Sequence, residues 1–199
     1  MAATTSRMVP PMILEGLVTT CDTDGRMHLA AMGPEVSEAE VAAGRLERLV
    51  LKPFATSQTA VNLARLGVGV FHATDDVLLI ARVVTGAAGP APARRAASAV
   101  QGWVLDDVCR AYEFEVVAAD RSADRERLEA RVVATHEGRP FMGLNRARHA
   151  VVEGAILVTR VHLLGAEEVK RRLADLRVLV EKTGSTREHE AFRLLEGHV

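Results

Sequence analysis

The sequence predicts an α+β fold in which strands come first and helices follow. Apolar runs of strand length, several of them β-branched or alternating, fill much of the chain before residue 136. From Arg146 onward the apolar residues recur at helical spacing instead. An α/β chain would alternate the two kinds of segment, so this order favours α+β. The 199 residues suffice for one compact domain, or for a domain with a subdomain.

The first predicted element is a β-hairpin. The run MILEGLVTT (residues 12–20) is apolar and β-branched, and RMHLAAM (26–32) follows it after Asp22-Thr23-Asp24-Gly25. An Asp-Gly pair between two strand-like runs is typical of a tight hairpin turn, because both central turn residues need positive φ. The acidic, alanine-rich stretch 36–44 then predicts a surface excursion or a short helix.

A strand and a short helix are predicted next. Residues 46–51 read as a strand, and between residues 60 and 66 the apolar positions change to helical spacing. Thr56 or Ser57 is available as the N-cap of this helix, and Gly67 is placed to end it.

The middle of the chain predicts more strands around one helix and one loop. The continuous apolar run VGVFHA (68–73) is typical of a buried strand, and Asp75 is expected to cap a helix over 77–84. The stretch GAAGPAPARRAAS (86–98) has no apolar period and predicts an exposed, mobile loop. Alternating runs at 112–117 and 128–135 predict two half-buried antiparallel strands.

Three helices are predicted after residue 145, over 146–164, 166–181 and 186–196, separated by Gly165 and Gly184. The apolar part of the first one is interrupted by charged residues and is shorter than the roughly 20 residues that a membrane span needs. We therefore expect a buried helix and no membrane segment.

Composition excludes several classes of function. Twenty-five basic and 26 acidic side chains leave a net charge of −1, so nothing suggests binding to nucleic acid, and an aromatic content of 4% argues against a base-stacking platform. The phosphate-loop, dinucleotide, zinc-protease and hydrolase motifs are missing, and the histidines show no ligand spacing, so no metal site is expected.

The cysteines and the first residues predict a cytoplasmic protein. Cys21 and Cys109 are too few and too far apart for a disulfide scaffold or a metal knuckle, so reduced thiols are expected. Residues 1–9 contain no apolar stretch of signal-peptide length and predict a frayed start.

One polar cluster surrounds the predicted start of the short helix. It consists of Lys52, Thr56, Ser57, Gln58, Thr59 and Asn62. Free backbone N–H groups, hydroxyls and an ammonium at a helix N-terminus form an anion site suited to a phosphate monoester. The same residues would also be explained by simple helix capping beside a solvated lysine.

A second cluster precedes the apolar helix and includes Arg139, Asn145, Arg146, Arg148 and His149. Its arginines could bind a carboxylate, a phosphate or a pterin-like ring. Alternatively it is a loop with a solvated first helical turn, although positive charge there opposes the helix dipole. His28 and His72 lie in strand-like runs, where a hydrogen-bonded structural role is the simpler interpretation of each.

Several blocks of the sequence together resemble one known family. They are MILEGLVTT, LVLKPFATSQTAVNL, GVGVFHATDDVLLIAR, YEFEV, RPFMGLNRARHAVVEGAILVTRVHLL and LVEKTG, and they span nearly the whole chain after residue 10. In these blocks the chain resembles domain-of-unknown-function family 447 (DUF447). That family looks like a branch of the FMN-binding split-barrel superfamily. The resemblance implies an antiparallel Greek-key β-barrel over residues 10–138, with a helical C-terminal subdomain over 139–199 packed on it.

The resemblance also implies a cofactor and its site. It implies a homodimer that holds FMN, with the isoalloxazine near Ala30, Met32 and Gly33, after a hairpin that ends at His28. The ribityl phosphate would lie at the stretch Thr56–Asn62, which coincides with the anion site argued above. The wider superfamily often has proline where this sequence has Ala31, which affects the expected flavin contact at that residue and leaves the fold unaffected.

The expected function is therefore that of an FMN-binding oxidoreductase. It would pass hydride or electrons between a reduced donor and a small substrate, with a pterin as one candidate, and no catalytic residue is assigned. Arg139, Asn145, Arg146 and His149 are the predicted substrate-binding residues, because a polar partner needs fixed donors beside the ring. The alternatives are a non-catalytic FMN carrier or sensor, and a scaffold whose helices bind another protein.

Overall fold

The computed structural model describes residues 11–199, and the start predicted at residues 1–9 lies outside them. The predicted α+β fold is confirmed. The strands are β1 (Met12–Ile13), β2 (Gly16–Cys21), β3 (Met27–Ala31), β4 (Glu35–Val36), β5 (Arg48–Leu51), β6 (Val68–Ala73), β7 (Arg94–Ala96), β8 (Trp103–Leu105), β9 (Arg110–Asp120) and β10 (Arg127–Glu137). The helices are α1 (Glu38–Ala42), α2 (Gln58–Leu66), α3 (Val77–Thr85), α4 (Arg146–Thr159), α5 (Val161–Leu164), α6 (Ala166–Thr183) and α7 (Thr186–Gly197).

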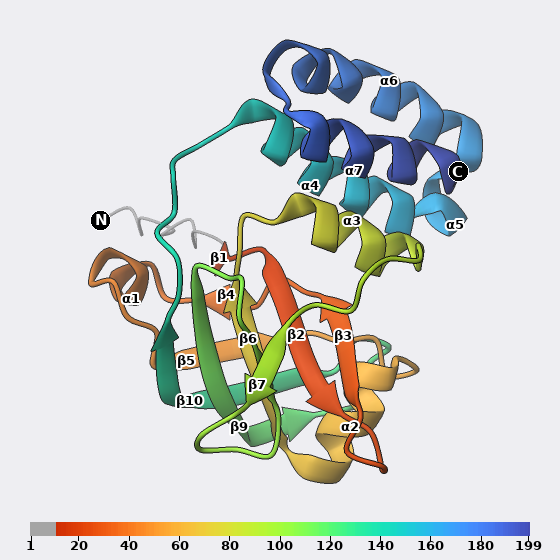
Figure 1. The fold of residues 1–199 in the computed structure, drawn as a ribbon. Coiled ribbons are helices and arrows are strands. Elements are labelled where there is room, and N and C mark those ends of the chain that lie inside the picture. Colours follow the sequence, from red (N-terminus) through yellow and green to blue (C-terminus); the bar gives the residue numbers. More distant parts are fainter. Residues whose placement is uncertain (1–10) are drawn as a thin grey trace, which may run out of the picture.

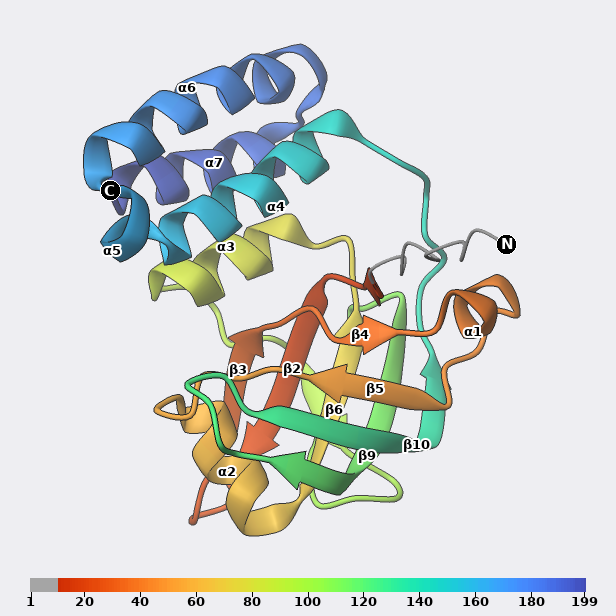
Figure 2. The same ribbon diagram turned by 180° about the vertical axis from the view of Figure 1, so that it is seen from behind.

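Eight of the strands form one antiparallel sheet in the order β1-β4-β5-β10-β9-β6-β2-β3. The sheet curls strongly, so that β5 and β10 run across β2 and β6 when viewed from behind (Figure 2). Helix α2 lies at the lower end of the barrel, and the C-terminal helices lie above it with α3 between (Figure 1). None of the described helices is both long and apolar enough to cross a bilayer.

The hairpin of β2 and β3 forms where the sequence predicts it, but Gly25 alone has positive φ in its turn, and not both central residues. Gly25 adopts a φ of 76°, and the Asp22 carboxylate accepts the backbone N–H groups of Asp24 at 2.9 Å and Arg26 at 2.8 Å. Five residue pairs then join the strands, from Cys21 opposite Met27 to Leu17 opposite Ala31. This local turn sets the register, which decides which β3 side chains share a face.

The central strands are apolar on both faces because each face covers a different hydrophobic cluster. The barrel cluster fills the inside of the curled sheet and comprises Val18, Val36, Leu46, Leu49, Leu51, Leu63, Phe71, Tyr112, Phe114, Leu128 and Ala130. The alternate residues of the same strands, such as Leu17, Val70 and Ala111, belong to a second cluster shared with the helices. This two-sided burial is the physical reason for the continuous apolar run 68–73.

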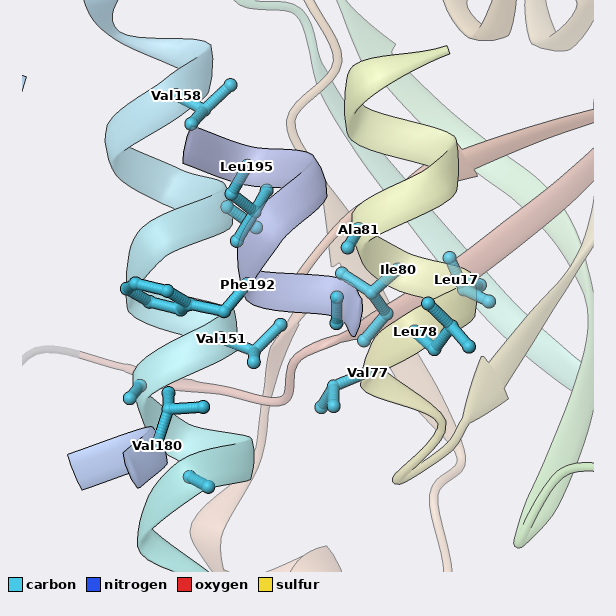
Figure 3. Packing of buried hydrophobic residues seen from close by; sticks show 14 of the residues in the cluster. Leu17, Val77, Leu78, Ile80, Ala81, Val151, Val158, Val180, Phe192 and Leu195 are labelled. Atoms are coloured by element: carbon cyan, nitrogen blue, oxygen red, sulfur yellow. The ribbon is translucent and has the colours of Figure 1, made fainter. Parts of the chain in front are cut away.

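The second cluster, here called the helix cluster, joins α3 to α4, α6 and α7. Val77, Ile80 and Ala81 of α3 face Val151 of α4 and Leu195 of α7 across it (Figure 3). A Cβ on Gly154 of α4 would lie 3.1 Å from Leu195 Cδ1 and 3.2 Å from Leu173 Cδ2. The three helices therefore approach closely at this position, where glycine leaves room for the two leucine side chains.

Two predictions about the middle of the chain need correction. The stretch predicted as a loop over 86–98 contains β7, which pairs with β8. The N-cap of α3 is Asp76, whose Oδ1 accepts the Leu79 N–H at 3.1 Å, and not Asp75. Neither difference was visible locally, because β7 has no apolar alternation and adjacent aspartates are equivalent candidates for a cap.

Two fully buried ionisable side chains fasten β8 and the connection before it to the sheet. Glu113 accepts the N–H groups of Ser98, Ala99 and Val100 at 2.6 to 2.9 Å, and His136 Nε2 lies 2.6 Å away. Burial opposes its ionisation, but the Ser98 N–H and the other donors outweigh this and lower its pKa to about 2. His72 Nε2 accepts the Leu105 N–H at 3.1 Å, a structural role that agrees with the sequence interpretation.

Candidate functional site

The N-terminus of α2 is the first part of the candidate site, and it forms as the sequence predicts. Ser57 is the N-cap, since its Oγ accepts the Ala60 N–H at 3.2 Å, and Gly67 ends the helix with a φ of 67°. The backbone N–H groups of Gln58 and Thr59 have no hydrogen-bond partner among residues 11–199. Two free amides, a hydroxyl that can still donate and the positive end of the helix dipole converge here.

Asn62 ties α2 to the sheet. Its Nδ2 donates to Thr20 Oγ1 at 2.9 Å, and its Oδ1 accepts Gln58 Nε2 at 2.8 Å. Asn62 is only 2% exposed. Because they bond to each other, the side chains of Asn62 and Gln58 are both engaged within the protein. The adjacent Thr59 is equally buried, whereas Thr56 is exposed in the turn before the helix.

Strand β3 forms the second part of the site. His28 lies directly opposite Thr20, the residue that binds Asn62, and Ala30 lies opposite Val18. Side chains directly opposite each other share a face, so His28 and Ala30 are on the face of β3 that α2 covers. Burial lowers the pKa of His28, which favours its neutral form.

Beyond β3, the chain holds the next predicted residues through its own contacts. The Met32 N–H donates to the Gly16 carbonyl at 3.0 Å. A Cβ on Gly33 would lie 2.5 Å from Ile13 Cγ2 and 2.9 Å from Glu15 Oε2. The close approach of Ile13 and Glu15 therefore explains why residue 33 is glycine. Gly33 can offer a ligand only its backbone.

Lys52 forms an ion pair that neither sequence interpretation included. Its ammonium forms an ion pair with the Glu35 carboxylate, and Arg127 lies 3.8 Å from the same carboxylate. The Lys52 side chain is 43% exposed, as the solvated interpretation requires, and Glu35 offsets its positive charge within the protein. Sequence reasoning could not find this pair, because the two residues are 17 positions apart.

The second predicted cluster takes part in an ion-pair network between the barrel and the helices. Asp75, whose side chain is 5% exposed, pairs with Arg139 and with Arg148 at 2.5 Å. Arg139 also pairs with Asp107 at 2.6 Å, and Arg148 with Glu188 at 3.2 Å. Burial opposes ionisation of Asp75, yet the two guanidinium groups outweigh it and lower its pKa. We call this network the junction.

Asn145 also serves the fold. Its Oδ1 accepts the N–H groups of Ala147 and Arg148 as the N-cap of α4, and its Nδ2 donates to the Thr183 carbonyl at 3.0 Å. Arg148 lies in the first turn of α4, where its positive charge opposes the helix dipole. Asp75 and Glu188 offset this charge, which explains why an arginine is tolerated there. The sequence signal for this ion pair is the Asp75-Asp76 pair. A helix needs only one capping carboxylate, so the second aspartate was available as a partner for an arginine.

Arg146 and His149 are exposed on α4. The connection from β10 to α4, which carries Arg139 and Asn145, runs up one side of the molecule, and α2 lies on the other side in both views (Figures 1 and 2). The structure therefore brings together the predicted residues of β3 and α2, and it separates them from the predicted substrate-binding group within one chain.

A cavity of about 330 Å³ adjoins the junction and is lined by Asp75, Asp76, Val77, Leu78, Asp107, Arg139, Arg148, Ser185, Arg187 and Glu188. Each of its arginines pairs with an acid, Arg187 with Asp76 at 2.8 Å. Its charges thus compensate one another, as expected for a structural junction. Within residues 11–199, no group of three or more histidine, cysteine or acidic side chains is arranged to hold a metal ion.

Two solved flavoproteins are similar to this chain along much of its length. An FMN-bound DUF447 protein from Methanosarcina mazei has a TM-score of 0.79 and 18% identity, over 96% of this chain and 97% of the other. The styrene monooxygenase flavin reductase of Pseudomonas putida S12 has a TM-score of 0.54 and 14% identity, over 64% and 82%. These likenesses show a split-barrel fold.

A third similar structure is an FMN-binding protein from Thermus thermophilus, solved with bound 1-cyclohex-2-enone, with a TM-score of 0.52 and 14% identity over 72% of this chain and 85% of that one. No curated protein matches this chain. The models of the protein of unknown function DUF447 match it twice, the N-terminal domain at residues 14–139 and the C-terminal model at 145–197. Since the N-terminal match alone covers more than half of its residues, the chain belongs to the DUF447 family.

Proposed function

We propose that this chain binds FMN between α2 and β3 and is an FMN-dependent oxidoreductase. It would pass hydride or electrons between a reduced donor and a small substrate. The observation that carries the proposal is the α2 N-terminus, where the free amides of Gln58 and Thr59 lie beside the Ser57 hydroxyl. The likeness to an FMN-bound DUF447 protein over 96% of the chain supports it.

The donors at α2 fit a phosphate monoester. Amide and hydroxyl donors at a helix N-terminus stabilise a dianion, and no carboxylate forms a hydrogen bond with them among the described residues. The ring would lie beside Ala30, Met32 and the backbone of Gly33, with His28 on the same face of β3 as Ala30.

FMN when bound supplies the hydride or electron transfer itself. The chain's part is to hold the phosphate, to orient the ring against β3 and to set the polarity near it. Since burial favours neutral His28, this side chain adds a hydrogen-bonding group and no positive charge. No acid or base of the chain is assigned to the reaction.

We also propose that the chain works as a homodimer, as the family resemblance implied. Arg146 and His149 are exposed on α4, which lies at the other end of the barrel from α2 (Figures 1 and 2), so they would reach a flavin held at α2 only in another copy of the chain. Their substrate-binding role stays a prediction. Arg139 and Asn145 are engaged at the junction and the α4 cap, so their contribution to such a site would be to hold the segment in place.

The first test is flavin binding by the purified chain. The protein should be yellow and should release FMN on denaturation, and Ser57→Ala with Thr59→Ala should weaken FMN binding by about 1–3 kcal/mol, because hydrogen bonds to a charged phosphate are lost. Fluorescence titration measures this, with Thr159→Ala on the exposed face of α4 as the control.

Riboflavin separates the phosphate role from the capping role of Ser57. An equal loss of riboflavin affinity would assign the effect to the α2 cap and would contradict the phosphate placement. Reduction of the bound flavin by NADH, NADPH or another reduced donor during turnover supports the oxidoreductase. A flavoprotein that no donor reduces would instead be a carrier or sensor.

A further inference from the structure

Arg125 is an uncompensated cation beside the segment that leads into α2. Its guanidinium carbon lies 4.2 Å from the centre of the Phe54 ring, and its Nη1 donates to the Lys52 carbonyl at 3.4 Å. Among the described residues, no carboxylate lies within 4.0 Å of its nitrogens. It is therefore positioned by an aromatic face and a carbonyl, with its charge left for another partner.

Backbone contacts hold Arg125 against this segment. Phe54 and Arg125 form a β-bridge, the Ala55 N–H donates to the Asp124 carbonyl at 2.9 Å, and the Glu126 N–H donates to the Pro53 carbonyl at 3.0 Å. The Ser57 N–H in turn donates to the Phe54 carbonyl at 2.9 Å. Phe54, with which Arg125 forms the bridge, is thus one tight turn before Ser57, the N-cap of α2.

Three cations near Arg125 are offset by acids. Lys52 pairs with Glu35, Arg121 lies 3.4 Å from Glu126, and Arg127 lies 3.1 Å from Glu129. Each of these charges is compensated within the protein, so an anion at α2 would gain little from them. Arg125 differs, because it has no such partner in the part of the chain that the structure describes.

We infer that Arg125 supplies the cation that binds the phosphate of FMN at α2, with Phe54 holding the guanidinium in place. The inference rests on the proposed function and replaces Lys52 in that role. A planar guanidinium donates two parallel hydrogen bonds to phosphate, and stacking on a ring reduces the freedom lost on binding. Phe54 is 47% exposed, so the stacked pair is accessible to a ligand.

The test compares FMN with riboflavin, which lacks the phosphate. Arg125→Gln should weaken FMN binding about 10- to 100-fold and leave riboflavin binding unchanged, because only the charged contact is lost. FMN affinity of the wild type should fall with salt, and the variant should show a smaller fall. Lys52→Met should change FMN affinity much less than Arg125→Gln.

Arg131→Gln is the matched control. Arg131 is an exposed arginine of β10 that pairs with Glu115. Its substitution removes the same charge as Arg125→Gln and should leave the affinities for FMN and riboflavin unchanged. Arg125→Lys keeps the charge and should bind FMN with an affinity between those of the wild type and Arg125→Gln. This variant keeps the proposal testable if the glutamine variant does not fold.

The outcomes separate the two proposals. Wild-type protein that binds neither flavin would overturn the FMN proposal and this one with it. Wild-type FMN binding that Arg125→Gln leaves intact, or equal losses for FMN and riboflavin, would overturn the Arg125 assignment alone.

Discussion

His72 shows how a single buried side chain makes stability depend on pH. Its Nδ1 lies 3.4 Å from the Leu17 carbonyl and its Nε2 accepts the Leu105 N–H, so the neutral ring with a proton on Nδ1 satisfies both neighbours. A second proton would place N–H against N–H at Leu105. Burial lowers the pKa of His72 from 6.5 to about 4.

The sign of the effect follows from the lowered pKa. The unfolded chain binds a proton at His72 more readily than the folded one, so this contribution is complete above pH 6.5 and is lost as the pH falls towards 4. We expect it to reach about 3 kcal/mol at its full extent.

The measurement is the urea midpoint of the wild type and of His72→Gln between pH 7 and pH 4. The glutamine oxygen can still accept the Leu105 N–H, and the variant should lose less stability on acidification than the wild type. Glu113, Asp75 and Glu188 also have lowered pKa values, so the difference between the two proteins, and not the wild-type curve, isolates His72. Parallel curves would contradict the prediction.

At the scale of elements, the packing of α4 against α6 and α7 depends on Gly154. The crowding at its Cβ position comes from the ends of two leucine side chains, Leu195 and Leu173, which can shift slightly. The helix α7 that contributes Leu195 is itself set locally by a capping box, in which Ser185 and Glu188 satisfy each other's backbone N–H groups.

We expect Gly154→Leu to lower the free energy of unfolding by about 1–3 kcal/mol, because the helices would have to separate. Gly154→Ala should stay within about 1 kcal/mol of the wild type, since better helix propensity offsets the crowding. Glu153→Leu, at the exposed neighbouring position, is the control. Denaturant unfolding checks all three, and a Gly154→Leu protein as stable as the wild type would show that the helices can reorganise freely.

At the scale of the molecule, the junction holds the helices against the barrel through Asp75. This carboxylate, at the end of β6, meets Arg139 from the connection after β10 and Arg148 from α4. Since it is almost fully buried, its removal leaves two guanidinium groups close together without the charge that balances them.

Asp75→Asn should therefore lower the free energy of unfolding by about 1–3 kcal/mol. Asp107→Asn is the matched control, because Asp107 binds the same Arg139 but is 73% exposed, and an exposed pair contributes less than about 1 kcal/mol. Thermal melting of the two variants gives the comparison. Equal effects would mean that burial at Asp75 does not strengthen the pair.

Local chemistry made much of the fold predictable. The hairpin turn at Gly25, the Ser57 cap, the Gly67 end of α2 and the buried strand 68–73 all depend on residues within a few positions of one another. The start of the candidate site was predictable for the same reason, because a helix N-terminus and its hydroxyls are contiguous in the chain.

The sequence by itself thus determined the order of strands and helices, their caps and turns, and the donor-rich start of α2. Only the tertiary structure decided which charges are paired. Lys52 pairs with Glu35, and Asp75 pairs with Arg139 and Arg148, whereas Arg125 has no carboxylate within 4.0 Å among residues 11–199. Caps and turns arise from contacts between near neighbours in the chain. Ion pairs between residues 17 to 73 positions apart exist only once the sheet has curled and the helices have packed on it.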